Sequence, residues 1–260
     1  MPEQPQPIAP RFPTCTSAEE LRANLAEVQD RIAAAAERGN RDPSDVRLLP
    51  VTKTMGDDPI TWLCETGITT VGENKVQEAQ AKAELFGHLD ASWAMIGHLQ
   101  SNKIGHVVDT AVELHSLDRT SLASRLDRRL QADGRSLDVF IQVNSSGEAS
   151  KYGLAPEEVL AFAREVEAMD SLQVRGLMTL AVFSDDHQLV RRCFETMVEL
   201  RRSLQQEMPD PESYGELSMG MSGDYELAIE MGATTVRVGQ AIFGARSLGS
   251  DHYWPTPTGG

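Results

Sequence analysis

The feature that most constrains this chain is a series of eight short apolar runs, each followed by a stretch with helical spacing of apolar residues. The runs are RLLPVTK, TTVGE, SWAMIG, VELHSL, DVFIQVN, VRGLMTL, ELSMGM and TTVRVG. Runs of this length between helical segments are typical of parallel strands joined by crossover helices. Eight such units favour an α/β fold with a single (β/α)8 barrel of the TIM type. An open doubly wound sheet is the alternative that the pattern leaves open.

An extra helix is expected before the first run. Ser17 and Glu20 form a capping-box pattern, and the apolar residues that follow recur at helical spacing up to Gly39. Residues 1–16 and 247–260 are rich in Pro, Gln, Gly or Ser, which predicts flexible tails. No repeat or linker interrupts residues 17–246, so we expect one domain there.

Charge and composition exclude several classes of function. The chain carries 24 basic and 39 acidic residues, a formal charge of −15, which argues against nucleic-acid binding and against an electrostatic membrane anchor. No apolar run approaches the roughly 20 residues that span a bilayer, and the N-terminus has no signal pattern. The three cysteines are far apart and form no zinc-like or redox pair, so we expect a reduced, cytoplasmic setting and no metal.

A lysine ends the first apolar run. At the carboxyl end of a barrel strand, where active sites of such barrels lie, Lys53 would sit near the mouth. Burial lowers the pKa of an ammonium group and frees an amine that can attack a carbonyl. A lysine that reaches solvent or pairs with Glu73 remains open as the alternative.

Two glycine-containing segments predict a phosphate site. SMGMSGDYELAIE places Ser222 as the N-cap of a helix after the seventh run, and RVGQAIFG supplies a tight turn after the eighth. Barrels often hold phosphate between these two loops. Ordinary capping and turn glycines are the alternative for each segment taken alone.

Arg237 lies inside the eighth apolar run, two residues before Gly239, so both share one face of the strand. Arg237 could bind phosphate or hydrogen-bond a ring nitrogen, which would stay unprotonated beside a permanent cation. His98 is expected to be a loop residue without a catalytic role, and His115 a hydrogen-bonded histidine of the barrel. Lys103 and Lys151 are expected to face solvent.

These residues lie in segments that resemble the pyridoxal phosphate homeostasis proteins. The similar blocks, in the family's order, are LLPVTKT, GENKVQEAQ, IGHLQSNK, HSLDR, IQVNSSGEASKYGL, GLMTL, LSMGMSGDYELAI and VRVGQAIFG, over about residues 18–246. The resemblance implies a single barrel like the N-terminal domain of alanine racemase, with pyridoxal 5′-phosphate (PLP) held as an aldimine. It also implies an intracellular role in PLP homeostasis.

The resemblance assigns cofactor-binding residues and no catalytic ones. Lys53 would form the Schiff base, Arg237 would face the pyridine nitrogen, and Asn74 would lie near the ring. The phosphate side would comprise Ser218, Gly220, Ser222, Gly239 and Gln240. Many members carry Thr at the position of Gln240, and many have Lys-Pro where MGDD follows Thr54 here.

The resemblance favours a carrier or regulator of PLP that lacks robust turnover. Few residues remain after Gly244, too few for the second domain whose tyrosine alanine racemase uses. A slow PLP-dependent racemase is the alternative, and an aldolase-like barrel that uses Lys53 is a third interpretation. PLP is the expected ligand, apo PLP-dependent enzymes are candidate partners, and we expect a monomer that binds neither nucleic acid nor membrane.

Overall fold

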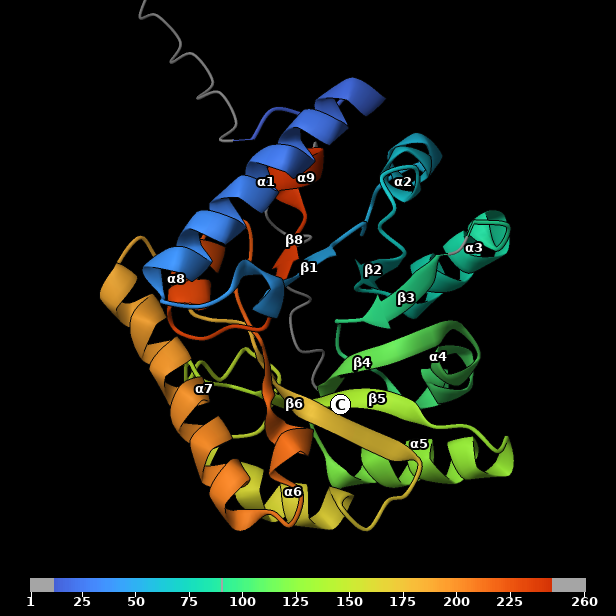
Figure 1. Ribbon diagram of the computed structural model, residues 1–260. Helices are drawn as coiled ribbons and strands as arrows, with labels where there is room; N and C mark the ends of the chain where they lie inside the picture. Colours follow the sequence, from blue (N-terminus) through green and yellow to red (C-terminus); the bar gives the residue numbers. More distant parts are fainter. Residues whose placement is uncertain (1–11, 90, 245–260) are drawn as a thin grey trace, which may run out of the picture.

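The computed structural model describes residues 12–89 and 91–244. Eight parallel strands form a barrel with helices packed around it (Figure 1). The strands are β1 (Arg47–Pro50), β2 (Thr70–Glu73), β3 (Ser92–Met95), β4 (Ala111–Leu117), β5 (Leu137–Val143), β6 (Leu172–Thr179), β7 (Glu216–Ser218) and β8 (Thr235–Val238). Of the predicted tails, 1–16 and 247–260, only residues 12–16 are among those described, and the boundaries of the domain stay a prediction.

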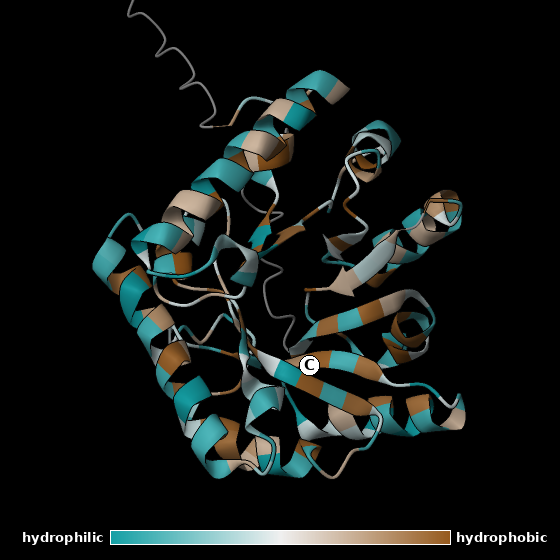
Figure 2. Ribbon diagram, in the orientation of Figure 1, coloured by the Kyte–Doolittle hydropathy of each residue, from teal (hydrophilic) through white to brown (hydrophobic). Residues whose placement is uncertain are grey.

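The outer layer is helical. Its helices are α1 (Ala18–Arg38), α2 (Asp57–Cys64), α3 (Val76–Phe86), α4 (Ile104–Thr110), α5 (Thr120–Ala132), α6 (Val159–Val166), α7 (His187–Glu207), α8 (Tyr225–Glu230) and α9 (Gln240–Phe243). Short 3-10 turns occupy η1 (Pro43–Asp45), η2 (Ser101–Lys103), η3 (Pro156–Glu158) and η4 (Pro211–Tyr214). Hydrophilic and hydrophobic residues alternate along α1 and α7 in Figure 2, as expected of helices that cover a sheet with one face.

The strand order is β1-β8-β7-β6-β5-β4-β3-β2, and the ladder is weakest between β1 and β2. There a single bridge joins Val51 to Gly72, and the Thr52 N–H donates to the Gly72 carbonyl at 3.1 Å. Pro50 explains the weakness: the N–H groups of Arg47 and Val51 donate to β8, so Pro50 faces β2 and has no N–H to offer. The predicted barrel is confirmed, and it is nearly closed.

Strand residues alternate between two environments. Leu217, Val236 and Val238 belong to the core cluster that also contains the buried faces of the helices. Leu49 and Phe140 are buried outside that cluster, and the His115 ring of β4 contacts Ser218 of β7, a strand that is not its neighbour. Such contacts cross the barrel interior, so the second set of side chains points inward.

The N-terminal helix begins as predicted. The Ser17 hydroxyl accepts a hydrogen bond from the Glu20 N–H at 3.2 Å, while the Glu20 carboxylate accepts from the Thr16 N–H at 2.7 Å. Cys15, just before the helix, donates its N–H to the Phe243 carbonyl of α9 at 3.0 Å. This hydrogen bond connects the segment before α1 to α9, which follows the last strand.

Two kinds of feature are absent from the described residues. Within residues 12–89 and 91–244, no helix is long and apolar enough to cross a membrane. The same part of the chain holds no group of three or more His, Cys, Asp or Glu side chains that could bind a metal ion.

Candidate functional site

The predicted site residues come from four strands that are neighbours at one side of the barrel. Lys53 follows β1, Asn74 follows β2, Ser218 ends β7 and Arg237 lies within β8. Lys53 lies in a turn in which the Met55 N–H donates to the Thr52 carbonyl at 3.0 Å. All of these residues except Arg237 lie at or beyond the carboxyl ends of their strands, the end where barrel enzymes build their sites.

Gly239 and Lys53 lie on adjoining chain segments. β1 and β8 pair in register with Leu49 opposite Arg237, and a Cβ atom at Gly239 would stand 3.1 Å from the Val51 carbonyl oxygen. A side chain at Gly239 would therefore crowd the segment that leads to Lys53. The glycine permits the ends of β8 and β1 to approach each other closely.

Gly220 has a structural reason to be glycine. Its φ is +95°, and a Cβ there would stand 2.7 Å from the Cβ of Ala228 in α8. Its carbonyl accepts the Arg237 N–H at 3.0 Å. Gly220 therefore ties the loop after β7 to the strand that carries Arg237, and direct contact with a ligand stays a prediction.

Ser222 does not cap the helix after β7, so that prediction was wrong. α8 begins at Tyr225 with Asp224 as its N-cap, and Asp224 accepts the Met221 N–H at 2.6 Å. The Ser222 hydroxyl instead accepts the N–H of Ala241, in α9, at 3.2 Å. Ser222 thus joins the loops after β7 and β8, the two loops predicted to hold phosphate.

Arg237 is buried in the barrel interior, with 3% of its surface exposed. Its guanidinium group donates to the Ser218 hydroxyl and to the Thr179 carbonyl, both at 2.7 Å. Among the described residues no carboxylate forms an ion pair with it. Burial, opposed by the negative charge of Asp224, lowers the pKa of Arg237 to about 10, so the group is still a cation at neutral pH.

A series of hydrogen-bonded polar side chains extends from Arg237 through the barrel interior, and the sequence analysis did not predict it. Ser218 contacts His115 Nδ1 at 2.9 Å, and His115 Nε2 contacts Glu113 at 2.8 Å. Arg47 binds both oxygens of Glu113 at 2.6 and 2.7 Å. Because Ser218 accepts from Arg237, its hydroxyl donates to Nδ1, which leaves Nε2 as the protonated nitrogen. His115 is fully buried and hydrogen-bonded, as expected.

Burial and the hydrogen bonds of this network determine the protonation states of His115 and Glu113. Burial, opposed by Glu113, lowers the pKa of His115 to about 4, so the ring is neutral. Hydrogen bonds from His115 and Arg47 outweigh the desolvation of Glu113 and keep its pKa below the usual range. The signal was present in the sequence: Arg47 and Glu113 are charges inside apolar runs, as Lys53 and Arg237 are.

Glu73, the alternative partner considered for Lys53, binds other groups. Its carboxylate accepts from the Thr52 hydroxyl at 2.6 Å and from Lys82 Nζ at 2.5 Å. Asn74, which follows it, is half-buried, and its carbonyl packs so closely on Gly97 that a Cβ at Gly97 would lie 2.1 Å away. Gln240, the remaining predicted phosphate residue, begins α9 beside Gly239.

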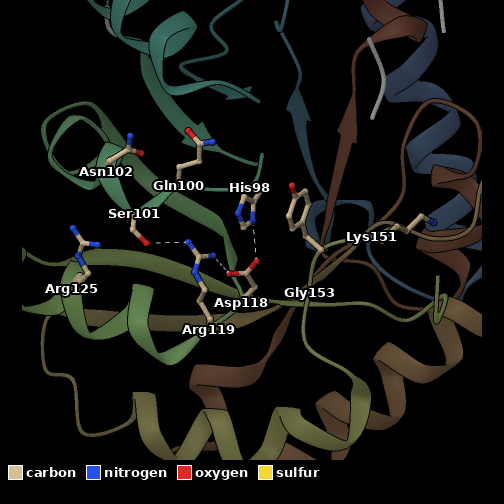
Figure 3. Close-up of a pocket in the computed structure, with 10 residues that line it drawn as sticks. His98, Gln100, Ser101, Asn102, Asp118, Arg119, Arg125, Lys151 and Gly153 are labelled. Carbon is tan, nitrogen blue, oxygen red and sulfur yellow. Dashed lines mark hydrogen bonds and ion pairs between the residues drawn. The ribbon is translucent and has the colours of Figure 1, made fainter. Parts of the chain in front are cut away.

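A pocket of about 790 Å³ lies at the same end of the barrel and contains none of the predicted cofactor residues. His98 stacks on Tyr152 with ring centroids 3.8 Å apart and contacts Asp118 at 3.1 Å (Figure 3). Lys151 does not face solvent, contrary to expectation. Its side chain is 7% exposed, and Nζ donates to the Ala181 carbonyl at 2.9 Å and pairs with Glu148. Lys103 is half-buried.

Comparison with known proteins places this barrel in a family. The model of the alanine racemase N-terminal domain matches residues 18–247. The pyridoxal phosphate homeostasis protein of Pseudomonas aeruginosa is 39% identical over 234 residues, which cover 88% of this chain and 97% of that protein. The chain belongs to the pyridoxal phosphate homeostasis proteins. The protein of that name from Aquifex aeolicus is 38% identical over 222 residues, or 85% of this chain and 96% of its own.

Solved structures of similar chains agree with the fold. PipY of Synechococcus elongatus, solved with PLP bound, is 34% identical with a TM-score of 0.73, and the match covers 84% of this chain and 100% of PipY. Alanine racemase of Corynebacterium glutamicum has a TM-score of 0.64 at 14% identity and covers 92% of this chain and 64% of the racemase. At that identity the racemase shows the fold alone.

Proposed function

We propose that this chain binds PLP in the mouth of the barrel as a Schiff base with Lys53 and serves PLP homeostasis by storing or delivering the cofactor. One observation carries the proposal: a buried arginine that forms no direct ion pair with any described carboxylate lies on β8, beside the strand that leads to Lys53. The PLP bound to PipY and the names of the curated relatives support it.

The side chains present fit this cofactor. Lys53 supplies an amine for the aldehyde. Ser222, at the junction of the loops after β7 and β8, supplies a hydroxyl for the phosphate, and the missing side chain of Gly239 leaves room beside Val51. Asn74 would lie near the ring, with Ser218, Gly220 and Gln240 on the phosphate side. Ser218 would act through Arg237, to which its hydroxyl is bonded.

The charge of Arg237 supports a role without robust turnover. PLP catalysis of amino-acid chemistry relies on a pyridine ring that withdraws electrons, most strongly when its nitrogen is protonated. Arg237, held as a cation by two hydrogen bonds at 2.7 Å, would donate to that nitrogen and keep it unprotonated. A slow racemase is the alternative. The likeness to alanine racemases at 14% identity shows a shared fold and does not favour it.

The partners and setting follow from the same proposal. Apo PLP-dependent enzymes are the recipients that a PLP store in the cytoplasm would supply. We propose a monomer that binds neither nucleic acid nor membrane, since the formal charge of −15 opposes binding to polyanions.

Borohydride reduction of the PLP-loaded protein, followed by peptide mass mapping, tests the proposal. We expect a visible absorption band before reduction and a phosphopyridoxyl group on Lys53 after it. Lys53→Ala should lose the band and keep its far-UV circular dichroism. Lys151→Met is the matched control, because it removes a buried lysine at the same end of the barrel and should keep the band. Label on Lys151 or Lys103 with Lys53 unmodified contradicts the assignment. A colourless protein that reacts with a sugar phosphate supports the aldolase interpretation.

A further inference from the structure

The backbone on both sides of Lys53 is bonded to a single helix, α3. We infer that Glu78 and Lys82 of α3 form a clamp that positions Lys53 for its reaction with the PLP aldehyde, an inference that rests on the proposed function. The clamp consists of two contacts: Lys82 Nζ to the Thr52 carbonyl at 2.7 Å, and the Thr54 N–H to Glu78 Oε2 at 3.0 Å. Neither residue belongs to the proposed cofactor site.

The two contacts hold the two peptide groups that flank the Cα atom of Lys53. The Thr52 carbonyl belongs to the peptide before Lys53, and the Thr54 N–H belongs to the peptide after it. A peptide group is planar, so fixing both groups fixes the two backbone dihedrals of Lys53. The direction in which its side chain leaves the backbone is then set by α3 together with the turn that the Met55 N–H closes on the same Thr52 carbonyl at 3.0 Å.

Lys82 is part of a buried ion pair. It is 8% exposed and Glu73 is fully buried, and the Thr52 hydroxyl donates to the same Glu73 oxygen that Lys82 binds. Burying a lysine and a glutamate is costly unless both are paired and hydrogen-bonded. Here both contacts go to one oxygen of Glu73, and the other oxygen, Oε2, is buried without a hydrogen-bond partner. The pair connects β2, α3 and the end of β1. The hydroxyl of Thr52 is therefore directed toward Glu73 and α3, at the point where the chain leaves β1 and enters the turn that contains Lys53.

The second contact stabilises an unusual backbone conformation. Thr54 has a φ of +66°, in the left-handed region that a β-branched residue adopts at a cost. Glu78 accepts its N–H and compensates for that conformation. Glu78 and Lys82 are one helical turn apart on the same face, and Ala79 and Phe86 anchor α3 in the core. Both residues of the clamp therefore belong to a helix whose position is set by core packing.

Two substitutions of Glu78 differ in whether the side chain can still accept the Thr54 N–H. Glu78→Leu removes the acceptor for the Thr54 N–H, whereas Glu78→Gln keeps an oxygen that can accept it. Both remove the exposed ion pair with Lys75, and since 26% of the Glu78 side chain is exposed, both should fold. Two probes are used: PLP, and 4′-deoxypyridoxine 5′-phosphate, which has the phosphate and ring but no aldehyde to react with Lys53.

We expect Glu78→Leu to lower PLP affinity about tenfold, or about 1.4 kcal/mol, and to slow the appearance of the visible band. Glu78→Gln should stay within about twofold of wild type, a change below about 0.5 kcal/mol. Both variants should bind the deoxy analogue as wild type does, because phosphate and ring contacts do not involve Glu78. A general loss of structure would weaken both probes together.

Lys82→Met combined with Glu73→Gln is the second test, because it removes both buried charges and leaves neither one unpaired. It should reproduce the selective loss of PLP over the analogue. Wild-type affinity and rates in Glu78→Leu, or equal losses for PLP and analogue in all variants, would overturn the clamp while leaving the proposed function intact. Absence of any visible band in the wild-type protein overturns the proposed function itself and the clamp with it.

Discussion

Two arginines point into the barrel, and their surroundings differ. Arg47, at the start of β1, binds both oxygens of Glu113, whereas Arg237, on β8, binds the Ser218 hydroxyl and the Thr179 carbonyl. Burial opposes the charge of Arg47, but Glu113 compensates and raises its pKa, while burial lowers that of Arg237 to about 10. Arg47 is thus neutralised within the protein, and Arg237 is a cation that an incoming ligand can use.

Removing Arg47 should have the largest effect on stability. Arg47→Met leaves Glu113, whose side chain is 12% exposed, without its bidentate partner. We expect a loss of about 3 kcal/mol in the free energy of unfolding, at the lower end for a broken buried pair, because 38% of the Arg47 side chain is exposed. Urea unfolding measures it. Arg47→Met with Glu113→Gln should recover most of the loss, because it leaves no unpaired carboxylate and keeps an oxygen that accepts from His115 Nε2. No loss in the single variant would contradict a structural role.

Acid should destabilise the protein through His115. The folded-state pKa of His115 is about 4, below its ordinary value of 6.5, so the unfolded chain takes up the proton at higher pH. Stability from the neutral ring is therefore complete above about pH 6.5 and is lost as the pH falls toward 4. His115→Gln should make the pH dependence of the unfolding free energy shallower in this range. The same slope in both proteins would show that His115 is not the group responsible.

Arg237→Gln should affect PLP affinity more than stability, whereas Arg47→Met is expected to affect stability. The substitution breaks no direct ion pair, but it disturbs two buried hydrogen bonds and removes a positive charge that favours the ionised form of Asp224. The free energy of unfolding should therefore fall by about 1 kcal/mol, less than for Arg47→Met. PLP affinity should fall about tenfold and the visible band should shift, because the ring nitrogen loses a charged donor. Equilibrium titration with PLP and urea unfolding of the same sample compare the two effects. A larger loss of stability than of affinity would make Arg237 a second structural arginine.

Ser222→Ala should have the smallest effect. Its hydroxyl accepts the Ala241 N–H and is proposed to contact phosphate, so PLP affinity should fall several-fold, by about 1 kcal/mol. Because Ser222 does not cap α8, the melting temperature of the cofactor-free protein should barely change. Unchanged affinity would remove Ser222 from the phosphate site.

The sequence predicted the barrel because its signals are local. Each strand is a short apolar run, and α1 and α5 have regular apolar faces that end near a glycine. No local pattern in the sequence indicates how completely the barrel closes between β1 and β2. Proline is unfavourable in an interior strand because it has no N–H to donate. Pro50 is tolerated in β1 because it faces β2, where the pairing is weak.

The site was predictable only in part. Lys53 and Arg237 stood out as charges in apolar runs, and register places their strands side by side. The hydroxyl of Ser222 and the amine of Lys151 depend on which loop lies beside them, which no local pattern encodes. Lys82 did leave a signal, because it lies on the buried face of α3 with Val76, Ala79 and Phe86.

The most direct measurement of the central claim is α-proton exchange in deuterated water, with PLP-loaded protein and an amino acid. If Arg237 keeps the ring nitrogen unprotonated, PLP should pass from the wild-type protein to the amino group of the amino acid. The α-proton of that amino acid should exchange little with the solvent. Arg237→Glu places a carboxylate beside that nitrogen, favours its protonation, and should exchange the α-proton faster per bound PLP. Rapid exchange by wild type that is lost in Arg237→Glu would contradict the carrier account and establish the racemase alternative.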